Sequence, residues 1–130
     1  MSDTNKNVVI TKAARIKLLQ ARAGDIVLPK IVKMAFGDGG VDADGTVIPP
    51  SENQTALTSE FFRKNISGHT YPEETKCRYE CELDFNDCVG KEISEIALID
   101  EDGDAVGIKT FTRKGKDDDV KQTYWLDDIF

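Results

Sequence analysis

The chain of 130 residues is long enough for one domain whose core needs no disulfide or metal ion to stabilise it. Its hydrophobic content of 39% and charged content of 32% are typical of a globular protein. The formal net charge of -7 at pH 7 argues against a nucleic-acid partner, because nucleic-acid binders gather Lys and Arg on one face to meet the phosphate backbone.

No apolar run reaches the length that a membrane span needs, so we expect no membrane partner. The first seven residues lack the apolar core of a secretory signal peptide, which predicts synthesis in the cytoplasm.

An amphipathic helix is predicted near the N-terminus. Thr11 is a favourable N-cap, residues 12–23 are rich in Ala, Leu and long straight side chains, and Gly24 is placed to end the helix. Ala14 and Leu18 belong to one apolar stripe along this helix. We expect that stripe to cover a β-sheet.

The next part of the chain alternates between extended and irregular segments. Residues 26–36 are rich in β-branched side chains without a polar face, which predicts a strand covered on both sides. Residues 37–53 are dominated by Gly, Asp, Pro and Ser, which predicts a long surface loop. Residues 55–62 predict a short helix or turn, and residues 64–70 an extended segment.

Three strands are predicted in the second half of the chain. Residues 77–85 alternate apolar and charged side chains, as in a half-buried strand. Residues 93–99 are apolar with few breaks, which predicts a buried strand. A turn centred on Gly103 follows, and residues 105–111 are predicted to form the antiparallel strand after it. We expect a three-strand antiparallel meander with the helix over its apolar face, which is an α+β fold.

The C-terminal part differs in composition. Residues 1–112 are expected to form the α+β domain, and residues 113–130 a charged linker followed by an aromatic segment. That segment is predicted either to pack back on the domain or to dock on a neighbouring subunit. The candidate interaction residues are Tyr124, Trp125, Leu126, Ile129 and Phe130. As a docking arm, this segment should be removable without unfolding the domain.

No catalytic or cofactor site is indicated. His69 is the one histidine, and it is interpreted as an exposed loop residue because no serine lies in a nucleophile motif. Residues 37–40 (GDGG) follow a strand as phosphate loops do, but neither a P-loop nor a dinucleotide-binding pattern continues from them. The sequence therefore predicts no enzyme.

Metal binding is also disfavoured. Cys77, Cys81 and Cys88 are interpreted as reduced thiols, because Cys77 and Cys81 on one strand would lie too far apart for a disulfide. Their spacing with His69 does not fit a zinc knuckle. The acidic run at residues 100–104 places its glycine in the wrong register for a calcium loop, so we interpret it as a solvated hairpin turn.

Four segments, taken in their order along the chain, carry a family resemblance. They are residues 10–14 (ITKAA), 33–39 (KMAFGDG), 54–63 (QTALTSEFFR) and 95–104 (EIALIDEDGD). Together they resemble the N-terminal domain of phage tail-collar fibre proteins, in which a Glu-Ile-Ala/Gly-Leu run leading to Asp-Gly is the most recognisable feature.

The resemblance implies an adaptor that attaches a tail fibre or collar to the baseplate of a phage or prophage (phage-like) tail. It implies a virion component made in the bacterial host cytoplasm, with other tail, baseplate or fibre subunits as partners and a homo-oligomer, most simply a trimer. Glu60 and Arg63 are then expected to form a local ion pair. Tail fibres normally continue into a shaft, so the chain would be either a stand-alone adaptor or a truncated fibre.

Two other classes of function stay open on the sequence. One is a tail assembly factor or binding module that is not retained in the particle. The other is a small hydrolase or metal-binding protein, which would depend on His69 or on the acidic turn.

Overall fold

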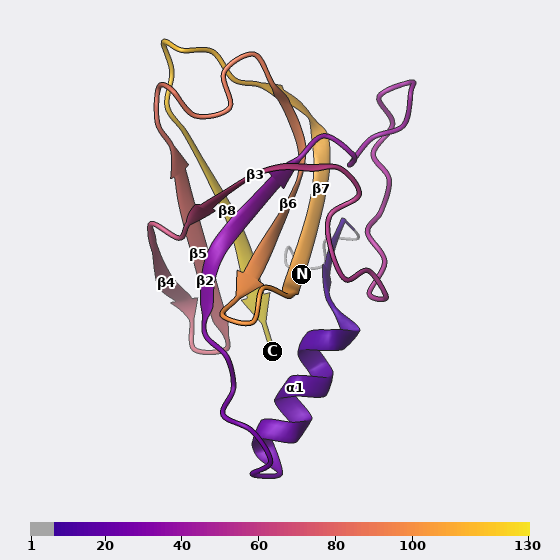
Figure 1. The fold of residues 1–130 in the computed structure, drawn as a ribbon, viewed down its shortest axis with the longest axis vertical. Helices are drawn as coiled ribbons and strands as arrows, with labels where there is room; N and C mark the ends of the chain where they lie inside the picture. The colour runs from indigo at the N-terminus through magenta and orange to yellow at the C-terminus, as the bar shows by residue number, and fades with distance from the viewer. Residues whose placement is uncertain (1–6) are drawn as a thin grey trace.

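The structure is a computed structural model that describes residues 7–130 and forms a two-layer β-sandwich with one projecting helix (Figure 1). The elements, in chain order, are β1 (Val8–Ile10), α1 (Lys12–Arg22), β2 (Ile31–Gly37), β3 (Glu60–Asn65), β4 (Gly68–Glu73), β5 (Lys76–Leu83), β6 (Glu92–Asp100), β7 (Ala105–Gly115) and β8 (Gln122–Ile129). All the strand pairs are antiparallel.

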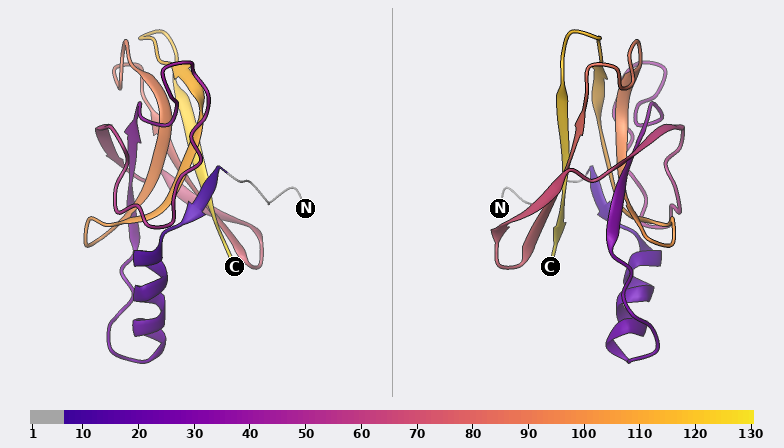
Figure 2. Two further views of the ribbon diagram at one scale, coloured as in Figure 1. Left: turned by 90° about the vertical axis from the view of Figure 1, so that its right-hand side faces the viewer. Right: turned by 60° about the vertical axis from the view of Figure 1, so that its left-hand side comes forward.

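The strands form two sheets. The larger has the order β1-β7-β6-β2-β3, and the smaller has the order β4-β5-β8. The two sheets lie face to face in the views of Figure 2. Because β6 and β2 occupy the middle of the larger sheet, their side chains are the most deeply buried of the chain.

The core between the sheets follows from strand alternation. Side chains from one face of β2 and β6 pack against side chains from β5 and β8. The buried members are Met34, Phe36, Cys81, Leu83, Ile93, Ile96, Leu98, Tyr124 and Leu126. The opposite face of the larger sheet carries a second apolar cluster, in which Ala35 is paired with Ala97 and lies near Ile99, Ala105 and Ile108. Leu57, from the long connection between β2 and β3, covers that second face.

Several predicted elements are confirmed. Thr11 is the N-cap of α1, since its side-chain oxygen accepts a hydrogen bond from the Ala14 N–H at 3.2 Å. Gly24, at φ +86°, follows the helix directly after Ala23. The strand predicted over residues 26–36 is confirmed in part. From Met34 onward β2 is buried on both faces, but residues 26–30 precede the strand and Val27 is 92% exposed.

The predicted α+β arrangement is wrong in one respect, because the helix does not cover the sheet. No residue of α1 is buried, and the helix extends beyond one end of the sandwich (Figures 1 and 2). The fold is therefore predominantly β. The cover that the sheet requires comes from the second sheet, which the sequence did not predict.

The predicted three-strand meander is only partly correct. β6 and β7 form the expected hairpin, but β5 pairs with β4 and β8 in the other sheet. Alternation within β5 fixes which of its side chains face inward, but it does not identify the neighbouring strand. The segment at residues 55–62 contains bends followed by the start of β3, so its predicted helical alternative is not observed.

Residues 113–130, predicted to be a charged linker and an aromatic segment, fall in the end of β7, a connecting loop and β8. β8 pairs with β5 in an unbroken register from Gln122 opposite Leu83 to Ile129 opposite Lys76. The structure thus places the aromatic part of this segment in a strand of the smaller sheet.

Ile96 tests the assignment of the central strand. It is 1% exposed, so Ile96→Asp would bury a charge without a partner. The variant should be unfolded at room temperature and should show no cooperative melt. Ile48→Asp is the matched control, because Ile48 is 45% exposed. Thermal melts followed by circular dichroism compare the two. A cooperative melt of Ile96→Asp near the wild-type temperature would contradict the assignment.

Candidate docking surface

The carboxylate of Glu95 fixes the long connection between β2 and β3. Glu95 lies on central strand β6 and is 1% exposed. Its Oε2 accepts hydrogen bonds from the N–H groups of Gly39 at 2.9 Å and Ser59 at 2.8 Å. Its Oε1 accepts one from the Thr58 N–H at 2.9 Å. One buried side chain therefore binds the beginning and the end of a segment that contains no strand of its own.

The GDGG run allows the backbone to approach Glu95 closely. A Cβ atom at Gly37 would lie 2.5 Å from Oε2 of Glu95, and one at Gly39 would lie 2.8 Å from the same atom. At Gly40 it would lie 1.9 Å from the carbonyl oxygen of Ser94, whose hydroxyl accepts a hydrogen bond from the Gly40 N–H at 2.9 Å. Glycine is thus needed at these positions because a side chain would clash with β6. This close packing accounts for the GDGG run, so no phosphate-binding role is needed to explain it.

A second carboxylate from the same strand anchors the helix. The side chain of Asp100 is 2% exposed, and its Oδ1 accepts hydrogen bonds from the N–H groups of Asp102 and Asp104, each at 3.0 Å. Its Oδ2 accepts one from the ammonium of Lys17 on α1 at 2.7 Å. Asp100 therefore shapes the β6–β7 turn and holds α1 against it.

The acidic turn and Lys17 form one charged cluster. Asp100, Asp102 and Asp104 each place a carboxylate oxygen within 4.8 Å of the others, a spacing that could hold a cation. The Lys17 ammonium lies among them, at 3.0 Å from Asp102 and 2.7 Å from Asp104. Burial alone would lower the pKa of Lys17, but the hydrogen bonds to the three carboxylates outweigh that effect and raise it. The turn thus already binds a cationic group from its own chain.

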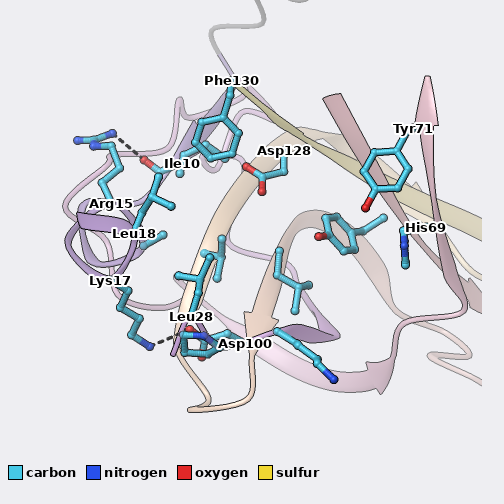
Figure 3. Close-up of a pocket in the computed structure, with 16 residues that line it drawn as sticks. Ile10, Arg15, Lys17, Leu18, Leu28, His69, Tyr71, Asp100, Asp128 and Phe130 are labelled. Carbon is cyan, nitrogen blue, oxygen red and sulfur yellow. Dashed lines mark hydrogen bonds and ion pairs between the residues drawn. The ribbon is translucent and has the colours of Figure 1, made fainter. Parts of the chain in front are cut away.

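A groove of about 380 Å³ opens between α1 and the smaller sheet (Figure 3). Leu18 and Leu28 line it on the helix side, while Tyr71, Asp128 and Phe130 line it on the sheet side. Most of the lining is apolar, so the groove can receive an apolar side chain or a short segment of another protein.

Asp128 is the unusual polar group of this groove. Its Oδ1 is buried and has no hydrogen-bond partner within residues 7–130. Burial raises the pKa of Asp128 above its ordinary value. The unpaired oxygen is therefore a cost that the fold itself bears.

The predicted C-terminal interaction residues fall into two groups. Tyr124 and Leu126 are buried in the core, and Ile129 is half-buried. Trp125 is 41% exposed and Phe130 is 71% exposed, so these two remain accessible to a partner. They lie at different places, since Phe130 lines the groove and Trp125 faces a separate hollow beside β7.

Trp125 is held between two cationic side chains. The Arg78 guanidinium carbon lies 4.0 Å from the centroid of its ring, and the Lys109 ammonium lies 3.8 Å from it. Arg78 also forms a paired hydrogen bond with Asp127. Trp125 is therefore a fixed part of the surface, with its orientation set by cation–π contacts.

Of the remaining candidates for chemistry, His69 lines the groove and the three cysteines do not. His69 is exposed as predicted, but it lies on strand β4 instead of in a loop, with its ring 5.6 Å from that of Tyr71. Cys81 is buried, Cys77 and Cys88 are half-buried, and all three are free thiols. Burial raises the pKa of Cys81 and of Cys88 to about 11, so both are protonated at neutral pH and are weak nucleophiles.

The predicted ion pair between Glu60 and Arg63 is confirmed, and both residues lie on β3. In the part of the chain that the structure covers, residues 7–130, no helix is long and apolar enough to span a membrane.

An antiparallel sandwich with anchored loops and an apolar groove is the arrangement of a structural or binding module. The model of the family described as phage tail-collar fibre protein, N-terminal, matches residues 3–124 of the chain. The chain belongs to this family, which confirms the resemblance seen in the sequence and makes it a structural protein of a phage tail. A search of curated proteins and a search of solved structures each gave no match.

The roles of Glu95, Lys17 and Asp128 were missed by sequence reasoning. A Glu inside an apolar run was a signal that a buried carboxylate needs partners, but its partners lie more than thirty positions away in sequence. Asp128 gave no signal, because its isolation depends on the packing around β8.

Replacing Glu95 should loosen the long connection. Glu95→Ala leaves three N–H groups without their acceptor, and we expect a loss of at least about 3 kcal/mol in the free energy of unfolding, since each such group costs roughly 1–3 kcal/mol. Glu95→Gln should cost less, because one amide oxygen still accepts. Glu92→Ala is the control, as Glu92 is exposed on the same strand. Urea unfolding measures stability, and hydrogen exchange at Gly39 reports the loop. Equal stability of Glu95→Ala and Glu92→Ala would contradict this role.

Replacing Lys17 should release α1. Lys17→Met removes the cation from three carboxylates and should cost on the order of 1–3 kcal/mol, with faster hydrogen exchange throughout the helix. Because the pKa of Lys17 is raised, its contribution is fully present below the ordinary pKa of 10.5 and is lost only as the pH rises above that value. Lys12→Met, at an exposed helix position, is the control. Identical exchange of α1 in the two variants would show that the cluster does not hold the helix.

Proposed function

We propose that this chain is an adaptor that attaches a tail fibre or collar to the baseplate of a phage or prophage tail. The observation that carries the proposal is the family match over residues 3–124, because it assigns the chain to tail-collar fibre proteins at their N-terminal part. An adaptor works by holding two partners in a fixed relative position. The hydrogen bonds of Glu95 and the ion pairs of Lys17 suit that task, because they stabilise the β2–β3 connection and the helix α1.

The groove is the surface on which we propose that a neighbouring tail subunit docks. It combines apolar walls with Phe130, which is 71% exposed, and Tyr71, which is 68% exposed. Large exposed aromatic side chains around an apolar hollow are typical anchors of protein interfaces. The adaptor would act as a homo-oligomer, and a trimer fits the symmetry of tail fibres.

The test is to purify tails from the source strain and to detect the chain by blot and by gold labelling. Label on the fibre-bearing end of intact tails supports the adaptor. Absence from intact tails, with the chain present in the lysate, would instead favour an assembly factor that leaves the particle.

A surface variant connects the groove with this role. Phe130→Asp should leave the melting temperature close to wild type, because Phe130 is exposed, and should lower incorporation into tails at least about tenfold if the ring is an interface anchor. Ile48→Asp introduces the same charge at an exposed site outside the groove and should incorporate normally. Equal incorporation of the two variants would show that the groove is not part of the interface.

A further inference from the structure

One edge of the smaller sheet is open. β8 pairs with β5 alone, so its other edge has no strand partner in the described part of the chain. The carbonyl of Glu80 accepts a hydrogen bond from the Ser67 N–H on the β4 side of β5, so Trp125, which lies opposite Glu80, points its backbone groups away from β5. Alternation along the strand gives Thr123 and Asp127 the same orientation. The backbone N–H and C=O groups of these three residues of β8 therefore face the open edge.

Of the four edge strands among the described residues, β8 is the least protected. β1 has three residues, and β3 and β4 each pair with their neighbour through a shifted register. β4 also contains Pro72, which has no N–H to offer to another strand. β8 has eight residues, no proline and an unbroken register with β5. A long regular edge of this kind is a template for a further strand.

A hollow of about 460 Å³ lies beside this edge, between β7 and β8. Phe111 and Trp125 supply its aromatic walls, and Lys109 and Lys114 supply two cations. A strand added along β8 would direct alternate side chains into this hollow, because successive side chains of a strand point to opposite faces. The hollow therefore determines which side chains such a strand should carry.

Lys109 is a half-buried cation that has no carboxylate partner among the residues that the structure describes. Its ammonium lies 3.8 Å from the centroid of the Trp125 ring and donates a hydrogen bond of 3.4 Å to the Trp125 carbonyl. Burial lowers the pKa of Lys109, and Asp127 opposes this effect. The neighbouring cations Arg78 and Lys114 lower the pKa further. Lys114 likewise forms no ion pair with a described residue.

The carboxylates nearest to the hollow do not neutralise its lysines. Asp127 is held by two hydrogen bonds from Arg78. Glu80 and Glu82 lie on β5, and β8 separates them from the hollow in the order of the sheet. The acidic run at residues 117–119 lies in the loop beyond β7 and forms no ion pair with either lysine. The two cations are thus available to a carboxylate that the described part of the chain does not supply.

We propose that an extended acidic segment of another tail protein adds as a strand to the open edge of β8. Its backbone would pair with Thr123, Trp125 and Asp127, and the side chains of one of its faces would enter the hollow. A Glu or Asp side chain there would pair with Lys109 and Lys114, and an apolar one would lie against the aromatic walls. Lysines at an edge discourage unselective pairing, so they favour a strand that brings carboxylates. The inference rests on the proposed adaptor, which must hold two partners, and identifies a second surface beside the groove.

Peptide binding tests the inference, and Trp125 reports it because the chain contains one tryptophan. The probes are an acidic octapeptide in which Val alternates with Glu and a counterpart in which Val alternates with Lys. The acidic peptide should shift the Trp125 emission to shorter wavelength in a saturable way and should slow hydrogen exchange at the N–H groups of Thr123 and Asp127. The lysine peptide should do neither. The net charge of -7 attracts the lysine peptide at long range, so a preference for the acidic one reflects the hollow.

Three variants of the full chain locate the site. The hollow variant, Lys109→Met with Lys114→Met, removes both cations and should weaken binding of the acidic peptide at least about tenfold. The control variant, Lys12→Met with Lys33→Met, removes the same charge at exposed positions outside the hollow and should bind like wild type. Thr123→Pro removes a backbone donor from the open edge and leaves the bonds between β8 and β5 in place. It should weaken binding while melting close to the wild-type temperature.

The inference is overturned if neither peptide binds, if both bind equally, or if the hollow variant binds the acidic peptide as tightly as the control variant does. A wild-type dimer in which the β8 edge is protected from exchange before any peptide is added would assign the edge to a second copy instead. The adaptor proposal fails separately. Wild-type chain that is absent from purified tails overturns the adaptor even where the acidic peptide binds. Tails that incorporate the hollow variant as well as the control variant overturn only the contact at β8.

Discussion

The carboxylate of Glu95 is the group on which the larger sheet and its covering loop most depend. A buried carboxylate is costly unless hydrogen bonds replace the water that it has lost, and here three backbone N–H groups do so. The same bonds satisfy N–H groups in a segment without strand partners. Loop and strand therefore stabilise each other, and the second face of the sheet acquires the cover of Leu57.

The run that carries the family resemblance is used mainly inside the fold. Glu95 and Asp100 lie at the two ends of its buried part, one binding the β2–β3 connection and the other binding α1 through Lys17. Ala97 lies between them and is paired with Ala35. Because both side chains are small, they leave room for the loop on that face of the sheet. A motif with these roles identifies the fold, and it says little about which partner the domain binds, because its polar groups are already occupied.

Local features of the sequence predicted the elements well, and long-range ones poorly. The Thr11 cap, the buried β6 strand and the β6–β7 hairpin depend on neighbouring residues, so composition and alternation were sufficient. The pairing of β5 with β8 and the projecting helix depend on contacts between distant segments. Alternation in β5 showed that one face needed cover but gave no means of choosing between a helix and a second sheet.

The same limit applies to the predicted interaction residues, whose role stays a prediction. Aromatic residues near the C-terminus indicated an interface, but their division into buried Tyr124 and exposed Phe130 follows from the register with β5. The helix stripe that was expected to cover a sheet instead lines a groove through Leu18, because a second sheet already fills that place. An amphipathic helix displaced from the core in this way keeps apolar surface to offer a partner. In a structural protein of a phage tail, that unfilled surface is where assembly can gain free energy.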